Sequence, residues 1–351
     1  MCGSIAARAV FRKRLASARS DWLNAPAATR RARAIAEADL STVPWLIEGA
    51  NRDLYLVGGA WRALARIHMS QTGYPLQMVH HYTISREEAR DLTGVIAGAG
   101  RRALERLPGL SRRRIDDLPF AAVALRRVLR ATGVRRVVFS ASGLREGWFM
   151  QRMPEPIRAE DPLLAAGQEL AGRLGRDPHL PPALLVWTDP LFPDEKGEAR
   201  RLREAACWMS DIGSHDHPEF RAEQAFLRVL RQPGIGLDHH ARAFLALAIA
   251  MRYEVDGDSG FLRPARLLLD VASTHRAEML GVALRLAYTL SAGTPDLLAG
   301  TELRLSGGRL ILRLQEDSGV FAGESVMRRL DRLAQAVGLE AATEAARERA
   351  A

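Results

Sequence analysis

Asp53-Leu54-Tyr55-Leu56-Val57-Gly58-Gly59 is the stretch of sequence that decides the fold of the first part of this chain. A short apolar run that ends in two glycines is typical of a strand entering a tight turn, and residues 60–69 have the pattern of a helix. Residues 136–140 resemble a second buried strand, and helices are expected between the strands at residues 91–107 and 117–132. A strand, a helical crossover and another strand predict a parallel α/β layer.

The remainder of the chain has a different pattern. Prolines and acidic residues mark a linker over residues 153–161, and the pattern is then helical over residues 163–291. Residues 302–314 alternate around a Ser-Gly-Gly turn, which predicts a β-hairpin. A last helix is expected at residues 324–337, and the alanine-rich, charged tail at residues 340–351 is expected to fray.

Length and composition describe an ordinary globular protein. A chain of 351 residues predicts two domains, and the absence of any apolar run of about 18 residues predicts no membrane span. Residues 1–14 lack the apolar stretch of a secretory signal. Cys2 and Cys207 make no disulfide framework, so a reducing cytoplasm is the expected compartment. Cys207 lies in an apolar run and is expected to be buried.

The charge of the chain favours an anionic partner. The formal net charge is +9, and Lys13 and Lys196 are the only lysines, so 48 of the 50 basic residues are arginines. A basic surface attracts polyanions such as phosphate polymers, nucleotides or nucleic acid. A GC-rich coding sequence would also explain the excess of arginine over lysine, but it leaves the positive potential in place.

Four motifs in order along residues 56–147 resemble one family of phosphatases. They are Leu56-Val57-Gly58-Gly59-Ala60-Trp61-Arg62, then Tyr74-Pro75-Leu76 with His80-His81-Tyr82, then Leu107-Pro108-Gly109-Leu110 with Arg112-Arg113-Arg114, and finally Ser142-Gly143-Leu144-Arg145-Glu146-Gly147. Together they resemble the C-terminal two-thirds of the exopolyphosphatase and guanosine-pentaphosphate phosphatase (Ppx/GppA) family.

The resemblance implies an α/β part followed by an all-α part. Residues 15–153 would form an incomplete second lobe of the actin-like or sugar-kinase (ribonuclease H-like) fold. Residues 162–292 would form a helical domain related to the HD-type metal phosphohydrolases, and residues 293–340 a small hairpin-and-helix unit. Residues 1–14 match nothing in the family and could be a foreign or shifted reading frame.

The helical domain resembles an HD domain that has lost its metal. Ser210-Asp211 stands where the family relatives have a His-Asp pair, and a serine cannot replace the imidazole ligand. No bound metal is therefore expected, and Asp211 and His217, with His215 and Asp216, remain only weak candidates as ligands. Neighbours on a helix point about 100° apart, so the pairs His80-His81 and His239-His240 are not expected to chelate one metal ion. Both pairs are expected to be ordinary surface or interface histidines.

The function that the resemblance implies is hydrolysis of a terminal phosphoanhydride in polyphosphate or in guanosine pentaphosphate, with Mg²⁺. The family's DxGSNS loop, catalytic glutamate and GGGS loop have no match here. We therefore expect an N-terminally truncated phosphatase that is inactive alone, so whether the chain is an enzyme stays open. The alternatives are a non-catalytic module that binds polyphosphate, regulates or dimerises, and a product without function.

The expected site has accessory roles only, with no catalytic residue. Backbone amides of Gly58, Gly59 and Ala60 would bind phosphate, because glycines at a strand-to-helix turn let amides approach an anion. Arg62 and Arg145 are candidate phosphate contacts, although Arg145 could instead pair with Glu146 or cap its helix, and a purely structural turn stays possible. The expected partners are polyphosphate or guanosine penta- or tetraphosphate and a second copy of the chain bound through the helical domain, with no membrane and no specific nucleic acid.

Overall fold

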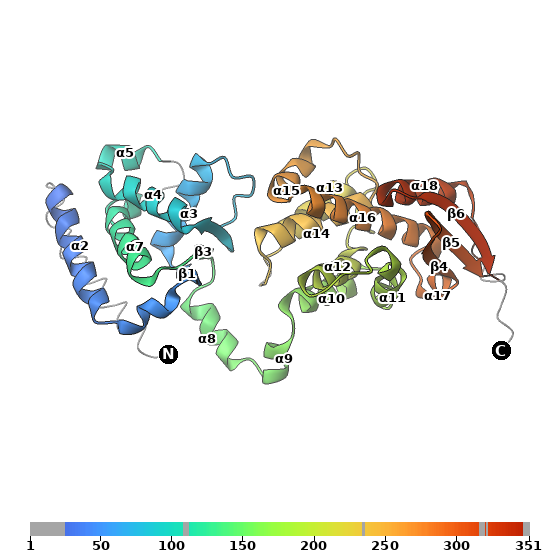
Figure 1. Ribbon diagram of the computed structural model, residues 1–351, viewed down its shortest axis with the longest axis horizontal. Coiled ribbons are helices and arrows are strands. Elements are labelled where there is room, and N and C mark those ends of the chain that lie inside the picture. The colour runs from blue at the N-terminus through green and yellow to red at the C-terminus, as the bar shows by residue number, and fades with distance from the viewer. Residues whose placement is uncertain (1–24, 108–111, 234–235, 316–319, 321, 347–351) are drawn as a thin grey trace. The chain divides into compact units, whose positions relative to one another are not determined.

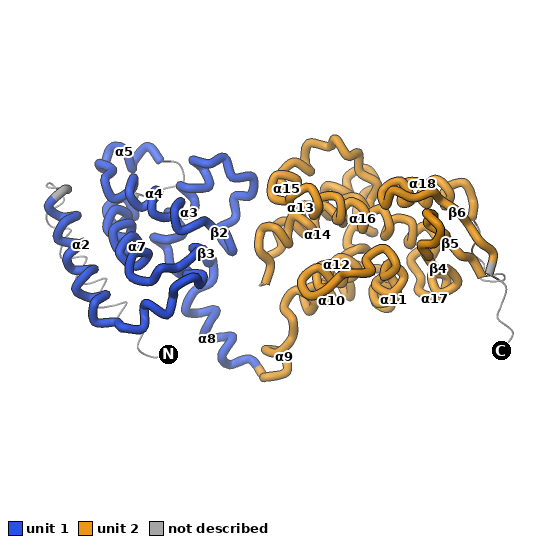
Figure 2. The backbone as a smooth tube through the Cα atoms, in the orientation of Figure 1, with its two compact units in different colours: residues 1–153 blue, residues 154–351 orange. Residues whose placement is uncertain are grey.

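The computed structural model describes residues 25–107, 112–233, 236–315, 320 and 322–346. The chain divides into two compact units, residues 1–153 and residues 154–351 (Figure 2), and each is described by itself. The expectations for residues 1–14 lie outside the described residues. No described helix is long and apolar enough to cross a membrane.

The first unit is built on a mixed three-stranded sheet. Strands β1 (Asp53–Val57) and β3 (Arg136–Ser140) are parallel neighbours, as their sequence patterns predicted. Strand β2 (Tyr82–Ser85) was not predicted; it pairs antiparallel with the other edge of β3, so the sheet order is β1-β3-β2 and the expectation of a purely parallel layer was wrong. With four residues, β2 is too short to show a clear alternation in the sequence.

The helices of the first unit are mostly longer than its strands. They are α2 (Ala25–Ser41), the 3₁₀ helix η2 (Pro44–Gly49), α3 (Gly59–Gln71), α4 (Arg86–Gly98), α5 (Arg101–Glu105), α6 (Arg112–Ile115), α7 (Leu118–Thr132) and α8 (Leu144–Arg152) (Figure 1). The single helix predicted at residues 91–107 was wrong, because α4 and α5 are separate. Ser85 and Glu88 form a reciprocal capping box that starts α4 one turn earlier, and the chain turns at Ala99 before α5.

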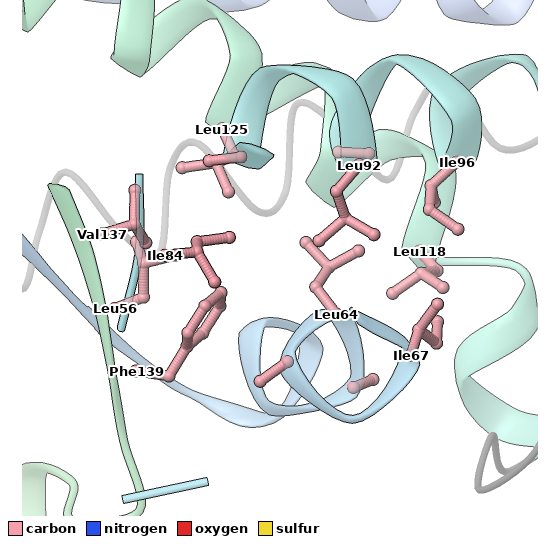
Figure 3. Close-up of a cluster of buried hydrophobic side chains, with 14 of the residues drawn as sticks. Leu56, Leu64, Ile67, Ile84, Leu92, Ile96, Leu118, Leu125, Val137 and Phe139 are labelled. Carbon is pink, nitrogen blue, oxygen red and sulfur yellow. The ribbon is translucent and has the colours of Figure 1, made fainter. Parts of the chain in front are cut away.

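The core of the first unit fixes helix α3 against the sheet. Buried side chains from α3, α4 and α7 meet those of the strands, as Figure 3 shows for Leu64, Ile67, Leu92, Ile96, Leu118, Leu125, Ile84, Val137 and Phe139. Burial of such side chains stabilises each by about 1.5–3 kcal/mol relative to exposure. Because α3 is held along its length, its first residues stay at the carboxyl end of β1.

One polar pair is buried inside this core. His68 of α3 and Tyr82 of β2 are both buried, and His68 Nδ1 lies 2.6 Å from the Tyr82 hydroxyl. Burial lowers the pKa of His68 below its ordinary value of 6.5 and raises the pKa of Tyr82 to about 12. Both groups are therefore neutral in the folded protein near neutral pH.

We expect acid to destabilise the first unit through His68. The pKa of His68 is lowered in the folded state, so below about pH 6.5 the unfolded chain binds the proton first and stability falls until the folded pKa is also passed. His68→Gln should make the fall of the urea midpoint below pH 6.5 shallower, while the same change at the exposed His215 should not. Parallel pH profiles of wild type and His68→Gln would contradict this role.

The second unit is a helical body, as predicted. Its helices are α9 (Glu155–Ala159), α10 (Pro162–Leu174), α11 (Leu180–Trp187), α12 (Glu198–Met209), α13 (Arg221–Leu230), α14 (His239–Arg252), α15 (Arg263–Leu268), α16 (Val271–Ser291), α17 (Pro295–Ala299) and α18 (Glu324–Val337), with short 3₁₀ helices η3 (Asp189–Leu191) and η4 (Gly260–Leu262). Helix α18 has the predicted bounds. The predicted linker at residues 153–161 contains the short helix α9.

A second three-stranded sheet ends the described chain. Strands β4 (Thr301–Ser306) and β5 (Arg309–Gln315) form the predicted antiparallel hairpin. The tail was expected to fray, but residues 340–346 form strand β6 (Glu340–Ala346), which pairs parallel with β5. Alanine and glutamate have weak strand preference, so this strand depends on the exposed edge of β5 as its hydrogen-bonding partner.

The centre of the second unit is the contact between α14 and α16. Helix α14 is buried along almost its whole length, including His239. Since His239 is 5% exposed within the chain, the expectation of a surface or interface histidine was wrong at this position. Gly281 of α16 faces α14 so closely that a Cβ atom would lie 2.5 Å from Met251 Cβ. The missing side chain at Gly281 is what lets the two helices approach. Cys207 is fully buried, as predicted.

Candidate functional site

The glycine turn lies where strand β1 ends and helix α3 begins. Gly58 has φ 136°, a backbone conformation that residues with a Cβ atom rarely adopt. Helix α3 starts at Gly59, so the first amides of the helix have no partner within it. These amides and the positive end of the helix dipole make the turn suited to an anion.

Two arginines converge on this turn. Arg62 of α3 donates from Nη1 to the carbonyl oxygen of Ala141, 3.2 Å away, in the loop that follows β3. The guanidinium of Arg114 lies against Gly59, where any Cβ atom would collide with it. The turn, Arg62 and Arg114 are thus together at the carboxyl ends of the two parallel strands, where ligands bind in open α/β sheets.

His80 joins the same place from the segment before β2. Its Nδ1 accepts a hydrogen bond from the amide of Ala141 at 3.3 Å. His80 and His81 also contact each other edge to face, with ring centroids 4.6 Å apart. The loop that follows β3 is therefore held by His80 and by Arg62, both from other elements.

Arg145 takes the alternative role that the sequence left open. Its Nη2 lies 3.0 Å from Glu146 Oε1, and its side chain is 82% exposed. Glu146 accepts from the amide of Gly143 at 2.6 Å, and hydrogen bonds from the backbone amides of Glu146 and Gly143 keep the pKa of this carboxyl below its usual range. A carboxylate thus occupies the N-terminus of α8, and a phosphate contact by Arg145 stays a prediction.

Asp211 lies in a network of arginines. Its carboxylate accepts from the backbone amide of Arg176 at 3.0 Å, from the same residue's Nε at 2.9 Å and Nη2 at 3.0 Å, and from Arg252 Nη2 at 3.1 Å. Ser210 bonds to the carbonyl of Cys207 at 2.6 Å and lies 2.9 Å from the Tyr288 hydroxyl. The Asp211 carboxylate therefore serves as the counterion of two guanidinium groups.

His217 does not join Asp211. It is exposed, and its Nδ1 accepts from the amide of Glu219 at 3.3 Å. Within the described ranges, no group of three histidine, cysteine, aspartate or glutamate side chains is placed to hold a metal ion.

The residues at the glycine turn do not fit a Mg²⁺ site. Mg²⁺ prefers carboxylate oxygens and water, but Glu146 is engaged with the start of α8. Asp53 lies at the opposite end of β1, where Arg136 Nη2 is 2.6 Å and Arg135 Nη2 is 3.3 Å from its carboxylate. Hydrogen bonds from these arginines, Arg136 foremost, lower the pKa of Asp53. The described side chains therefore supply donors to an anion and no ligand set for the cation.

Comparison with known proteins agrees with the order of the two units. Residues 18–155 match the Ppx/GppA phosphatase family, and residues 163–343 match the family described as exopolyphosphatase, C-terminal. The chain belongs to the Ppx/GppA phosphatase family, which confirms the resemblance found in its motifs. It is similar to retrograde regulation protein 2 of Saccharomyces cerevisiae, with 27% identity over 220 residues. That match covers 57% of this chain and 35% of the relative, so the chain spans about a third of the relative's length.

Sequence reasoning missed Arg114 as part of the turn. The signal was present, because Arg114 ends the arginine run of the third motif, but nothing in the sequence showed which arginine of the run points to Gly59. The two predicted arginines also differ in the structure. Arg62 reaches the loop after β3, whereas Arg145 faces solvent beside Glu146.

Proposed function

We propose that this chain is an exopolyphosphatase-like protein that binds the phosphate groups of polyphosphate or of guanosine penta- or tetraphosphate without hydrolysing them by itself. The observation that carries the proposal is that Arg62, which reaches the loop after β3, and Arg114, which lies against Gly59, flank the turn formed by Gly58, Gly59 and Ala60. Guanidinium groups bind phosphate oxygens bidentately, and amides add short charge-assisted hydrogen bonds. The proposal includes an actin-like lobe for residues 15–153, an HD-related domain for residues 162–292 and a cytoplasmic location.

The chemistry of the turn supports binding more than hydrolysis. Hydrolysis of a phosphoanhydride by this family would use a carboxylate to activate water, a contribution of about 10²–10⁴-fold in rate for such a general base. Asp53 begins the strand that leads into the turn and Glu146 lies in the helix after the β3 loop, and each is already engaged with an arginine or with backbone amides. Neither of these two carboxylates is free to act as the base, whereas the turn and its arginines supply electrostatic stabilisation of phosphate.

A regulatory or dimerisation role is the second candidate. The curated relative carries a name that describes regulation, and a non-catalytic member could act by pairing with a second copy of the chain through the helical unit. Light scattering on the purified chain at two concentrations tests this role. A monomer mass at both concentrations would rule out the homodimer.

We expect polyphosphate to bind weakly and mainly through the glycine turn. Arg62→Gln with Arg114→Gln should weaken binding at least tenfold, because each hydrogen bond to a charged group contributes about 1.5–3 kcal/mol. The matched control is Arg90→Gln with Arg130→Gln, which removes the same charge from exposed positions on α4 and α7 of the same unit. Titration of long-chain polyphosphate at several salt concentrations measures both affinity and its dependence on charge.

Two outcomes would contradict the proposal. Equal loss of affinity in the two double variants would mean that only diffuse charge attracts the polymer. Release of phosphate by the wild-type chain with Mg²⁺ at about 1 s⁻¹ or faster, an ordinary enzymatic rate, would mean that the chain is a phosphatase in its own right.

A further inference from the structure

The second unit contains a small cavity that is lined mainly by arginines. Its volume is about 220 Å³. The five lining arginines come from five separate parts of the fold, the segment after α10 and the helices α13, α14, α16 and α18: Arg176, Arg221, Arg252, Arg285 and Arg329. Two tyrosines and two hydroxyl side chains complete the lining: Tyr253, Tyr288, Ser214 and Thr289.

The positive charge of this arginine pocket is only partly compensated. Asp211 pairs with Arg176 and Arg252. Glu254 pairs with Arg285 and lies 3.6 Å from Arg329 Nη2. Arg221 forms no ion pair with a residue of the described chain. Five guanidinium groups therefore face two carboxylates, which leaves an excess of three positive charges.

One donor atom on each of four arginines also lacks a hydrogen-bond acceptor. The Nε atoms of Arg221, Arg252, Arg285 and Arg329 are buried and have no hydrogen-bond partner among the described residues. Buried polar groups in native proteins are almost always paired, and an unpaired one commonly marks an ion or water at that place. Four such donors around one cavity indicate that an acceptor belongs inside it.

Mutual repulsion strengthens this conclusion. Burial lowers the pKa of Arg285, and Glu254 partly offsets this by raising it. The neighbouring positive charges lower the pKa further: those of Arg329, Arg252 and Arg221. Guanidinium groups stay protonated in proteins, so the repulsion cannot be relieved by loss of a proton. An anion in the cavity would relieve it.

The geometry of the pocket is held in place without a ligand. Arg252 lies over the rings of Tyr288, at 3.9 Å from the centroid, and Tyr253, at 4.2 Å. Arg221 lies over Tyr253 at 5.5 Å. The Tyr253 hydroxyl accepts from the amide of Gly213 at 2.8 Å, which fixes the ring. Such cation–π contacts orient the arginines before binding and lower the ordering cost.

Size and charge together select the ligand. The positive lining repels cations, and the scarcity of apolar side chains excludes an apolar ligand. Pockets for drug-sized molecules have volumes of about 300–1,000 Å³, so a cavity of about 220 Å³ suits a compact anion better than a whole nucleotide. Arginines that pair bidentately with tetrahedral oxyanions favour phosphate among compact anions.

We propose that the arginine pocket is a second phosphate site, which binds inorganic phosphate or pyrophosphate, or the equivalent terminal group of a longer phosphorylated molecule. This second site is separate from the site of the proposed function. The residues that line the arginine pocket all belong to the second unit, whereas the glycine turn belongs to the first. Since the bound anion would tie together α13, α14, α16 and α18, binding stabilises the helical unit.

Titration calorimetry on the full chain tests this site. All measurements use a chain that already carries Arg62→Gln and Arg114→Gln, the background variant, so that the glycine turn does not contribute to binding. The ligands are phosphate, pyrophosphate and tripolyphosphate. Adding Arg221→Gln, which costs no ion pair, should weaken pyrophosphate binding at least tenfold. The matched control is Arg231→Gln on the same helical segment, which removes an exposed charge and should change affinity less than twofold. Pyrophosphate should also raise the thermal midpoint only where Arg221 is present.

The outcomes separate this site from the glycine turn. Equal pyrophosphate affinity in the Arg221→Gln and Arg231→Gln chains would overturn the proposal, as would loss of all binding in the background variant. Binding of tripolyphosphate without binding of phosphate or pyrophosphate would overturn the assignment to a compact anion. Arg329→Gln, which approaches from α18, provides a second variant should Arg221→Gln alter the near-ultraviolet circular dichroism.

Discussion

Glu195→Ala is expected to lower the free energy of unfolding of the second unit by about 3–5 kcal/mol. The Glu195 side chain is 1% exposed, accepts from Arg203 Nε at 2.6 Å and pairs with Arg276. Arg203 is fully buried. Removal of the carboxylate leaves two guanidinium groups short of a counterion, and one of them, Arg203, is fully buried. Urea-induced unfolding followed by far-ultraviolet circular dichroism measures the loss.

The control for this prediction is a surface pair of the same kind. Glu169 and Arg173 are paired at 3.3 Å on α10, and their side chains are 68% and 72% exposed. Glu169→Ala should cost at most about 0.5 kcal/mol, because water screens the charges. Asp189 lies 2.5 Å from Arg203 Nη2 and is the other possible counterion. If Glu195→Ala costs less than about 1 kcal/mol, well below the range for broken buried pairs, then Asp189 suffices as the counterion of Arg203.

Gly281→Ala is expected to destabilise the second unit by about 1–3 kcal/mol, the usual cost of overpacking a core. The added Cβ atom would meet the carbonyl oxygen of Ala248 and lie 2.5 Å from Met251 Cβ. Both atoms belong to or adjoin the backbone of α14 and cannot rotate away. The helices would have to separate. Arg252 on α14 and Arg285 on α16 would then also move apart, so pyrophosphate affinity should fall with stability.

At a second glycine, the change to alanine is expected to stabilise the protein. Gly172 of α10 has open space where its Cβ would lie, and glycine in a helix interior costs about 1 kcal/mol relative to alanine. Gly172→Ala should therefore raise the urea midpoint, while Gly281→Ala lowers it. A stabilising effect of both substitutions would mean that α14 and α16 separate without cost.

Local patterns were sufficient for the elements with strong periodicity. The run before Gly58 predicted β1, and residues 324–337 predicted α18 with its observed bounds. The Ser-Gly-Gly turn predicted the hairpin of β4 and β5 because its residues favour a reversal of the chain. In each case the residues that specify the element are neighbours in the sequence.

The elements that were missed depend on partners far along the chain. Strand β2 forms because β3 offers a free edge to Tyr82–Ser85, and β6 forms because β5 offers one to residues 340–346. Neither segment has a strong strand pattern of its own. The break before α5 was also missed. It is made by Ala99 and Gly100 alone, and the residues on either side of them have a helical composition.

The two candidate sites also differ in how far the sequence could predict them. The glycine turn could be predicted, since a strand, its glycines and the following helix N-terminus are consecutive, and backbone amides need no distant partner to face an anion. Arg114 required the fold to show that it reaches Gly59. The arginine pocket could not be predicted, because its residues run from Arg176 to Arg329 and look like ordinary surface arginines in the sequence.

The sequence by itself determined the family, the order of an α/β part and a helical part, and the strand-to-helix position of the glycine turn. Each of these depends on residue type and short spacing. Only the tertiary structure decided which arginines have a buried Nε atom without a hydrogen-bond partner. The physical reason is that a charge becomes functional through its desolvation and its neighbours, and both are set where helices distant in sequence, such as α13 and α18, meet around one cavity.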